Sequence, residues 1–344
     1  MMKFVILSSG VFNYMLNKTG NMLLRYRPED VCAVISPEHA GKTAQDVIGY
    51  GGKIPVVSSF AKAQYTKPDT LVLGGAPQGG IISQLVRSEI NHALESGCDI
   101  ISGMHTFLND DPEIRNLAEQ YSCTLTDLRR PPNPPHFPKG LWKDRKIPVL
   151  LVVGSDCDTG KMTTAWELAN RLKKKGLNAE FLGTGQTGIL LSGNGVPIDA
   201  VVSDFMAGEI EHSIEKIGEC DLIILEGQGS LTNQYYAGVT LGLLHGSMPD
   251  FLVMTHEVVR KSDTTGFPSA KLRDCMPTYI DLMKPFKSSR FVGINLLTVN
   301  QPEKEAKKTI SDIESKIGIP TTDLVRFGDQ SLIDSILKDV QNWN

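Results

Sequence analysis

Short runs of apolar residues recur along the first third of the chain, separated by stretches with helical spacing. These runs are Phe4–Leu7, Val31–Ile35, Pro55–Val57, Thr70–Leu73 and Asp99–Ile101. In residues 81–95, a helix would align five apolar side chains on one face: Ile82, Leu85, Val86, Ile90 and Leu94. Continuous apolar strands alternating with amphipathic helices are typical of a parallel sheet covered on both faces. We therefore expect a Rossmann-like α/β domain at residues 1–128.

Five prolines fall between Arg129 and Pro138, directly after this pattern. Proline fixes φ and lacks a backbone donor, so this segment suits neither a helix nor a central strand. We interpret residues 129–146 as an extended, semi-rigid linker.

The alternation of strands and helices then resumes. The apolar runs are Ile147–Val153, Ala179–Leu182, Asp221–Leu225, Phe251–Met254 and Phe291–Asn295, and helical patterns cover Met162–Lys174 and Lys304–Ile317. Residues 147–344 are therefore predicted to form a second α/β domain, of the P-loop NTPase-like kind. Two domains also agree with 344 residues at one domain per ~150 residues.

The composition excludes several classes of protein. A net charge of -4 provides no overall basic field for nucleic acid. The six cysteines form no CxxC pair, and no His/Cys cluster has zinc-finger spacing. No apolar run reaches the ~18 residues of a membrane-spanning helix, and the N-terminal run is too short for a signal peptide. We expect a cytoplasmic protein with no membrane partner, a small-molecule substrate and a homo-oligomeric state.

The sharpest motif joins a buried strand to a helix, as a phosphate-binding loop does. It comprises Gly154, Ser155, Asp156, Cys157, Asp158, Thr159, Gly160, Lys161, Met162, Thr163 and Thr164. Glycines let backbone N–H groups curl around an anion, the helix N-terminus adds positive potential, and Lys161 adds a mobile cation. Met162 replaces the hydroxyl residue that usually ligates Mg²⁺, although Thr163 or Thr164 could substitute.

Further polar loops follow the strands of the second domain. Gly183–Gly188 carries Gln186 and Thr187, and Glu226 begins a segment that includes Gln228 and Ser230. At the carboxyl end of a strand, Glu226 would face the ligand crevice of an α/β sheet; the alternative is an acid that satisfies loop amides. Asp204, near a helix start, is a candidate base or metal ligand, with N-capping as the alternative.

Two histidines complete the candidate site. His245 follows an apolar run in the second domain, and His105 follows a strand of the first domain within Gly103–Phe107. That loop and Gly74–Gly80 could face the second domain. The first domain lacks a GxGxxG with a downstream acid, so its sequence does not favour NAD binding.

These motifs resemble known families. The second domain is similar to dethiobiotin synthetase, in which the residue matching Asn295 often contacts adenine. Nearly the whole chain resembles a two-domain family catalogued as a domain of unknown function. The resemblance rests on an ordered set of motifs: AGKTAQD, APQGG, SGMHTFL, GSDCDTGKMTT, GTGQTG, SDFMAGEIE, EGQGSL and VTLGLLHGSMPD. Its better understood members are described as D-glutamate N-acetyltransferases.

This resemblance implies transfer of an acetyl group from acetyl-CoA to D-glutamate. The loop and Lys161 would hold the donor's pyrophosphate, and Asp204, Glu226 or His245 would be the base. His105, Gln186, Thr187, Gln228 and Ser230 would contact the substrate.

Two alternatives remain open. The residues alone favour an ATP-dependent ligase or kinase like dethiobiotin synthetase, with Thr163, Asp204 and Glu226 on Mg²⁺. The third hypothesis is a nucleotide-sensing switch without turnover.

Overall fold

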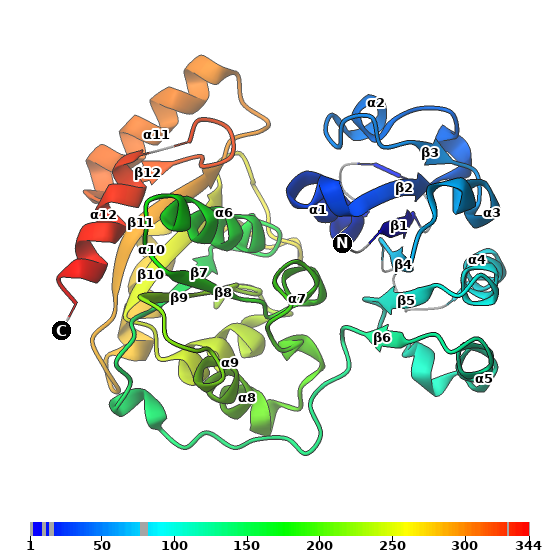
Figure 1. Ribbon diagram of the computed structural model, residues 1–344. Coiled ribbons are helices and arrows are strands. Elements are labelled where there is room, and N and C mark those ends of the chain that lie inside the picture. The colour runs from blue at the N-terminus through cyan, green and yellow to red at the C-terminus, as the bar shows by residue number, and fades with distance from the viewer. Residues whose placement is uncertain (1–2, 9–11, 14–16, 76–81, 329, 344) are drawn as a thin grey trace. The chain divides into compact units, whose positions relative to one another are not determined.

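The computed structural model describes the whole chain except residues 1–2, 9–11, 14–16, 76–81, 329 and 344. The chain divides into two compact units. One contains Met1–Arg130 and Ile189–Gly193, and the other contains Pro131–Gly188 and Asn194–Asn344. Each unit contains a parallel sheet of six described strands with helices around it (Figure 1). The expected α/β class is confirmed.

The sheet of the first unit has the strand order β3-β2-β1-β4-β5-β6. Its strands are β1 (Phe4–Leu7), β2 (Val31–Ile35), β3 (Val56–Val57), β4 (Thr70–Leu73), β5 (Asp99–Ser102) and β6 (Leu125–Asp127). The helices are α1 (Lys18–Tyr26), α2 (Ala44–Ile48), α3 (Phe60–Ala63), α4 (Gln84–Glu95) and α5 (Pro112–Gln120). Residues 76–80 of the glycine-rich loop after β4 lie outside the described residues.

Helix α4 corrects one sequence prediction. It begins at Gln84 because the Ser83 hydroxyl accepts a hydrogen bond from the Val86 amide, which caps the helix. Leu85 is 63% exposed, so placing it on the buried face was wrong. Val86, Ile90 and Leu94 are buried as expected.

The sheet of the second unit has the strand order β12-β11-β10-β7-β9-β8. Its strands are β7 (Val149–Gly154), β8 (Ala179–Leu182), β9 (Leu222–Leu225), β10 (Phe251–Glu257), β11 (Arg290–Leu297) and β12 (Thr321–Thr322). The helices along this part of the chain are α6 (Lys161–Lys174), α7 (Gln186–Ser192), α8 (Ser203–Glu215), α9 (Ala237–Ser247), α10 (Leu272–Met283), α11 (Glu303–Ile317) and α12 (Gln330–Gln341).

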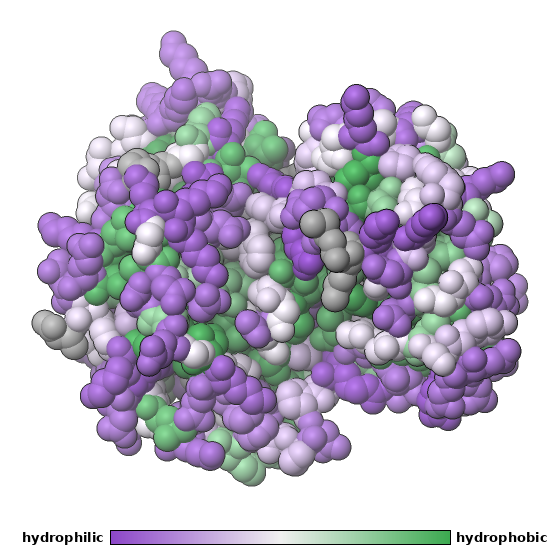
Figure 2. Space-filling view, viewed as in Figure 1, coloured by the Kyte–Doolittle hydropathy of each residue, from purple (hydrophilic) through white to green (hydrophobic). Residues whose placement is uncertain are grey.

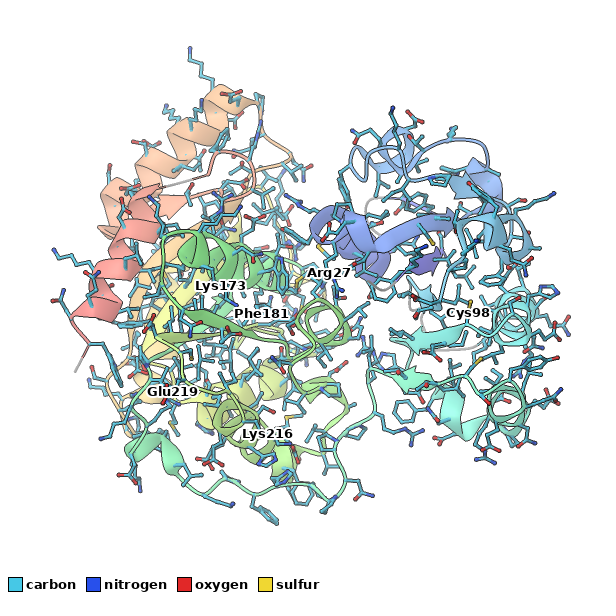
Figure 3. The ribbon with its side chains drawn as sticks, in the orientation of Figure 1. Arg27, Cys98, Lys173, Phe181, Lys216 and Glu219 are labelled. Carbon is cyan, nitrogen blue, oxygen red and sulfur yellow. The ribbon has the colours of Figure 1, made fainter. Side chains whose placement is uncertain are left out.

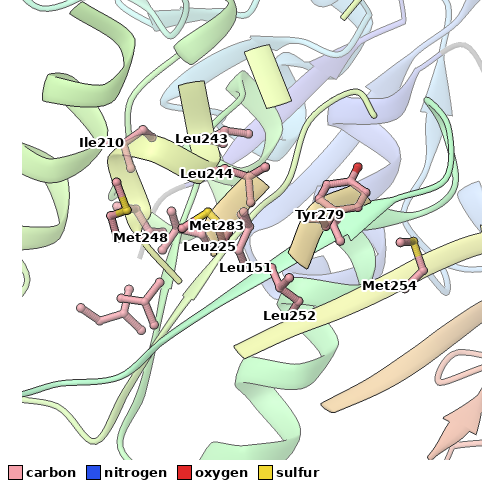
Figure 4. Packing of buried hydrophobic residues seen from close by; sticks show 14 of the residues in the cluster. Leu151, Ile210, Leu225, Leu243, Leu244, Met248, Leu252, Met254, Tyr279 and Met283 are labelled. Atoms are coloured by element: carbon pink, nitrogen blue, oxygen red, sulfur yellow. The ribbon is translucent and has the colours of Figure 1, made fainter. Parts of the chain in front are cut away.

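The continuous apolar strands of this second sheet are explained by burial of both faces. In β7, Leu151 packs into the core with α8, α9 and α10, whereas Leu150 packs into the core with α6 and α12. Figure 4 shows the first core, where Leu225 and Leu252 of the sheet lie with Leu243 and Leu244 of α9. On the other face, Trp166 of α6 meets Phe181 of β8 edge-on, with 5.0 Å between ring centroids. Phe181 is labelled in Figure 3.

Strand β10 runs through Glu257, beyond the end predicted at Met254, so Thr255 and His256 belong to the sheet. The short strands β6 and β12 and the last helix, α12, were not predicted. In α12, Leu332, Ile333 and Ile336 are buried, a helical spacing that was present in the sequence.

Hydrophilic residues cover much of the molecular face in Figure 2, interrupted by small hydrophobic patches. Among the described helices, none combines the length and the apolar character needed to cross a membrane.

Candidate functional site

The loop between β7 and α6 has the backbone of an anion-binding site. Gly160 precedes the helix with φ +88°, and Asp158 also has a positive φ, so the chain turns sharply before α6 begins. The N-cap residue of α6 is Gly160, which has no side chain to cap the helix. The amide groups of the first turn of this 14-residue helix therefore face forward with the positive end of its dipole. This geometry fits a phosphate group.

Lys161 lies inside the loop and not on the surface. Its side chain is buried, and its ammonium donates to the Asp156 carbonyl oxygen at 2.6 Å. A Cβ at Gly154 would come within 2.8 Å of Lys161 Nζ, and a Cβ at Gly227 would lie 1.7 Å from the Val152 carbonyl oxygen. Glycine is therefore needed at both positions for the lysine and its neighbouring strands to pack this closely.

Asp156 is the most heavily bonded carboxylate of the loop. Its Oδ1 accepts from the Cys157 amide at 2.7 Å and from Asn233 Nδ2 at 2.8 Å, and its Oδ2 accepts from Arg260 Nη1 at 2.6 Å. Asn233 follows β9 and Arg260 follows β10, so two other loops converge on this residue. The Asp156 carboxylate thus joins the loops after β7, β9 and β10.

Strand β10 and helix α10 fix the rest of the loop. Ser155 Oγ lies 2.7 Å from His256 Nδ1, and Thr159 Oγ1 lies 2.7 Å from Thr255 Oγ1. Burial lowers the pKa of His256, which favours the neutral imidazole. The Tyr279 hydroxyl donates to the Gly154 carbonyl oxygen at 2.8 Å.

The Cys157 thiol is a packing group within this loop. It is buried, and burial raises its pKa more than the charge of Lys161 lowers it. A raised pKa leaves the thiol protonated and unreactive.

Met162, Thr164 and Asn295 pack behind the loop. Met162 is buried, and Thr164 Oγ1 accepts from Asn295 Nδ2 at 2.8 Å. The Leu324 amide donates to Asn295 Oδ1 at 2.8 Å. Both polar groups of Asn295 thus bind the protein itself, and its contact with adenine stays a prediction. No cluster of three His, Cys, Asp or Glu side chains suited to a metal ion occurs within the described ranges.

Glu226 joins the end of β9 to the loop after β8. Its Oε2 accepts from the amides of Thr184 at 3.0 Å and Gly185 at 3.3 Å. A Cβ at Gly188 would lie 2.2 Å from the same oxygen. This is the geometry of the alternative considered from the sequence, an acid that satisfies loop amides.

The predicted substrate residues of the second unit lie around this junction. Gln186 and Thr187 begin α7, and the Gln228 amide donates to the Thr184 carbonyl oxygen. Ser230 lies 2.9 Å from the Thr232 hydroxyl, which donates to the Ser155 carbonyl oxygen at 3.1 Å. The loops after β8 and β9 are therefore bonded to each other, and the loop after β9 is bonded to the anion-binding loop.

The remaining candidates lie elsewhere. Asp204 is exposed on the first turn of α8. His245 lies near the end of α9, where it packs against Phe286, at the edge of the sheet where β10 begins and not where β7 ends. His105 follows β5 in the first unit and is largely exposed. Partial burial of its ring, together with the charge of Arg129, lowers its pKa.

Two other acids of the SDFMAGEIE motif bind the proline-rich segment. Glu209 Oε1 accepts from the His136 amide at 2.7 Å, and Glu211 Oε1 accepts from the Leu141 amide at 2.8 Å. Both acids are buried. Residues 136–141 therefore pack on α8 and do not form a free spacer there.

Arg260, Asn233 and Tyr279 are site residues that sequence reasoning missed. A basic residue soon after an apolar strand was a weak signal for Arg260. Asn233 and Tyr279 carried no signal, because their contacts with the loop span 77 and 125 residues.

Comparisons with known proteins cover both units. A family described as a domain of unknown function (DUF1611), Rossmann-like domain, matches residues 37–131, and its P-loop counterpart matches residues 136–333. The chain is similar to a D-glutamate N-acetyltransferase of Tritonibacter scottomollicae, with 38% identity over 80% of this chain and 83% of the relative. One from Pseudoalteromonas sp. is 35% identical over 81% of this chain and 84% of the relative.

A crystal structure shows the same fold. A DUF1611 family protein from Anabaena variabilis is 33% identical and has a TM-score of 0.92, covering 98% of this chain and 100% of that one.

Proposed function

The chain belongs to the DUF1611 family, and we propose that it transfers an acetyl group from acetyl-CoA to the amino group of D-glutamate. The observation that carries this proposal is the 38% identity, over four-fifths of the chain, to a relative named for that reaction. The second relative bears the same name. These relatives support an enzyme of the acyltransferase class.

The anion-binding loop supplies a place for the donor. Acetyl-CoA carries a pyrophosphate, which the amides at the start of α6 and the ammonium of Lys161 would bind. Such a site needs no hydroxyl side chain to bind Mg²⁺. The buried Met162, at the position where that hydroxyl residue usually stands, therefore fits this proposal.

The length of the donor favours a base that lies outside the loop. Its arm spans roughly 15 Å when extended, by the usual reach of a covalent chain, so the thioester lies beyond the loop. Glu226 is buried and already binds two amides, and His245 lies at the other edge of the sheet. Asp204 is exposed at the start of α8 and is the base that we propose.

The reaction then balances simply. The amine nitrogen attacks the thioester carbonyl carbon, so a C–N bond forms as the C–S bond breaks. Asp204 accepts the proton from nitrogen, and this proton then passes through water to the leaving thiolate, which restores the Asp204 carboxylate. Asp204→Asn is expected to lower kcat with little change in the affinity for CoA.

Calorimetric titration with acetyl-CoA and with ATP tests the donor. Acetyl-CoA should bind the native protein, and Lys161→Ala should weaken that binding. Lys173→Ala, an exposed lysine of the same helix paired with Glu180 (Figure 3), is the matched control. Thiol release with D-glutamate but not L-glutamate would support the acceptor. Tight ATP binding without acetyl-CoA binding would overturn the proposal in favour of an ATP-dependent ligase.

A further inference from the structure

We infer that Arg260 and Asn233 are positioning residues, which hold the anion-binding loop in its ligand-binding shape through Asp156. We call these three residues the loop clamp. The inference rests on the proposed function only in assigning the phosphates of acetyl-CoA to this loop. The clamp itself follows from contacts within the protein.

The centre of the clamp is a carboxylate with almost no access to water. Asp156 is 2% exposed. A buried carboxylate is costly unless several donors meet it. Arg260 supplies the opposing charge at 2.6 Å, and Asn233 supplies a neutral donor at 2.8 Å. Removing either donor would leave the charge of Asp156 partly unsatisfied.

Both donors are themselves held in place. Arg260 Nε donates to Glu257 Oε2 at 2.6 Å, and Arg260 Nη1 also donates to the Cys157 carbonyl oxygen at 2.8 Å. Asn233 Nδ2 donates to Thr264 Oγ1 at 2.7 Å, and Asn233 Oδ1 accepts from the Tyr235 amide at 3.0 Å. The clamp thus ties the loops after β9 and β10 to each other as well as to the anion-binding loop.

The charges around Arg260 indicate how it acts. Two carboxylates, Asp156 and Glu257, contact its guanidinium. Burial disfavours the charged form, but the hydrogen bonds to these two acids outweigh burial and raise the pKa of Arg260. Because its charge is already balanced, Arg260 is a support for the loop and not a phosphate ligand.

The clamp reaches Lys161 through a single residue. Lys161 Nζ donates to the carbonyl oxygen of Asp156, whose carboxylate Arg260 and Asn233 hold. Fixing Asp156 therefore fixes both the curvature of the loop and one partner of its lysine. A loop ordered before binding loses less entropy when the ligand arrives, which strengthens binding without adding contacts.

Hydrogen exchange of the protein without ligand tests the clamp directly. In Arg260→Ala, the amides of residues 155–164 should exchange faster than in the native protein. The matched control is Arg273→Ala, which removes an exposed arginine on α10 whose partner Asp274 is also exposed. In this control, the amides of residues 155–164 should exchange at the native rate. Equal exchange in Arg260→Ala and the native protein would overturn the inference.

Steady-state kinetics separates positioning from catalysis. Arg260→Ala should raise KM for acetyl-CoA about tenfold, as expected for losing hydrogen bonds to a charged group, while kcat changes little. Arg260→Lys should recover part of this loss, because it keeps the charge but not the fork that reaches both Asp156 and Cys157. A fall in kcat at unchanged KM would contradict a positioning role.

A second variant covers the case in which Arg260→Ala does not fold. Asn233→Asp has nearly the same shape, but it sets a second carboxylate against Asp156. It should also speed exchange in residues 155–164, and native exchange would overturn the inference. If exchange rises as expected while the native protein binds no acetyl-CoA, the proposed donor is wrong and the clamp stands.

Discussion

Two buried aspartates stand at opposite edges of the second sheet. At the carboxyl edge, Asp156 binds Arg260, Asn233 and the Cys157 amide. At the amino edge, Asp250 binds Lys287 at 2.5 Å, Arg145 at 3.2 Å, Trp343 Nε1 at 3.0 Å and the Val149 amide at 2.9 Å.

The two aspartates differ in the structure that surrounds their contacts. Around Asp250, Arg145 also donates to the carbonyl oxygens of Ser247 and Met248 at the end of α9. These contacts therefore tie the end of α9 to the start of β10. Close to Asp156, the N-cap position of α6 is Gly160, which has no capping side chain. Similar chemistry thus stabilises the fold at one edge and supports the proposed anion-binding loop at the other.

The largest expected effect is on stability at the amino edge. Asp250→Ala removes the carboxylate shared by Arg145 and Lys287, and it should lower the free energy of unfolding by about 3–5 kcal/mol. Asp274→Ala, at an exposed pair, should cost less than about 1 kcal/mol. Urea unfolding measures both. Similar losses in the two variants would mean that Asp250 is not a structural lock.

Packing at the carboxyl edge gives the next effect. Gly227→Ala places a methyl group 1.7 Å from the Val152 carbonyl oxygen. Such overpacking typically costs about 1–3 kcal/mol, and the displaced Lys161 should weaken acetyl-CoA binding as well. Gly238→Ala, in α9 with no atom within 4 Å of its Cβ, should be neutral or stabilising. Thermal unfolding and calorimetry of both variants would show whether the close contact matters.

A paired asparagine substitution sharpens the contrast between the edges. Asp156→Asn should raise KM for acetyl-CoA about tenfold, because the loop loses the charge that Arg260 holds. Asp250→Asn should lower the melting temperature and leave that KM unchanged. If Asp250→Asn raised KM equally, the two edges would not have separate roles.

The smallest expected effect concerns pH. Burial lowers the pKa of His256, so the folded protein keeps it neutral while the unfolded chain binds a proton. The free energy of unfolding should therefore fall as the pH falls through the ordinary histidine pKa of about 6.5. Between pH 7 and 5, this fall in the free energy of unfolding should be smaller in His256→Asn, because the variant lacks this histidine. The other histidines titrate in both proteins and so do not contribute to the difference. Parallel pH profiles would argue against the burial of His256.

The sequence predicted what depends on local pattern. Alternating apolar runs identified the α/β fold, and the spacing of Gly154, Gly160 and Lys161 located the P-loop between a strand and a helix. The network around that loop could not be predicted, because Arg260 is separated from Asp156 by 104 residues and no local pattern specifies such a contact. Glu226 was found by its position at a strand end, but its two amide partners depend on how the loop after β8 folds back.

The buried acids Glu209 and Glu211 determine where the second unit can be separated from the rest of the chain. A fragment starting at Ile147 would lack the amides of His136 and Leu141 that bind these carboxylates. Two buried negative charges would then lose donors, and the fragment would be prone to misfold. A fragment starting at Pro131 keeps both contacts, so a fragment meant to contain the second unit should include the proline-rich segment.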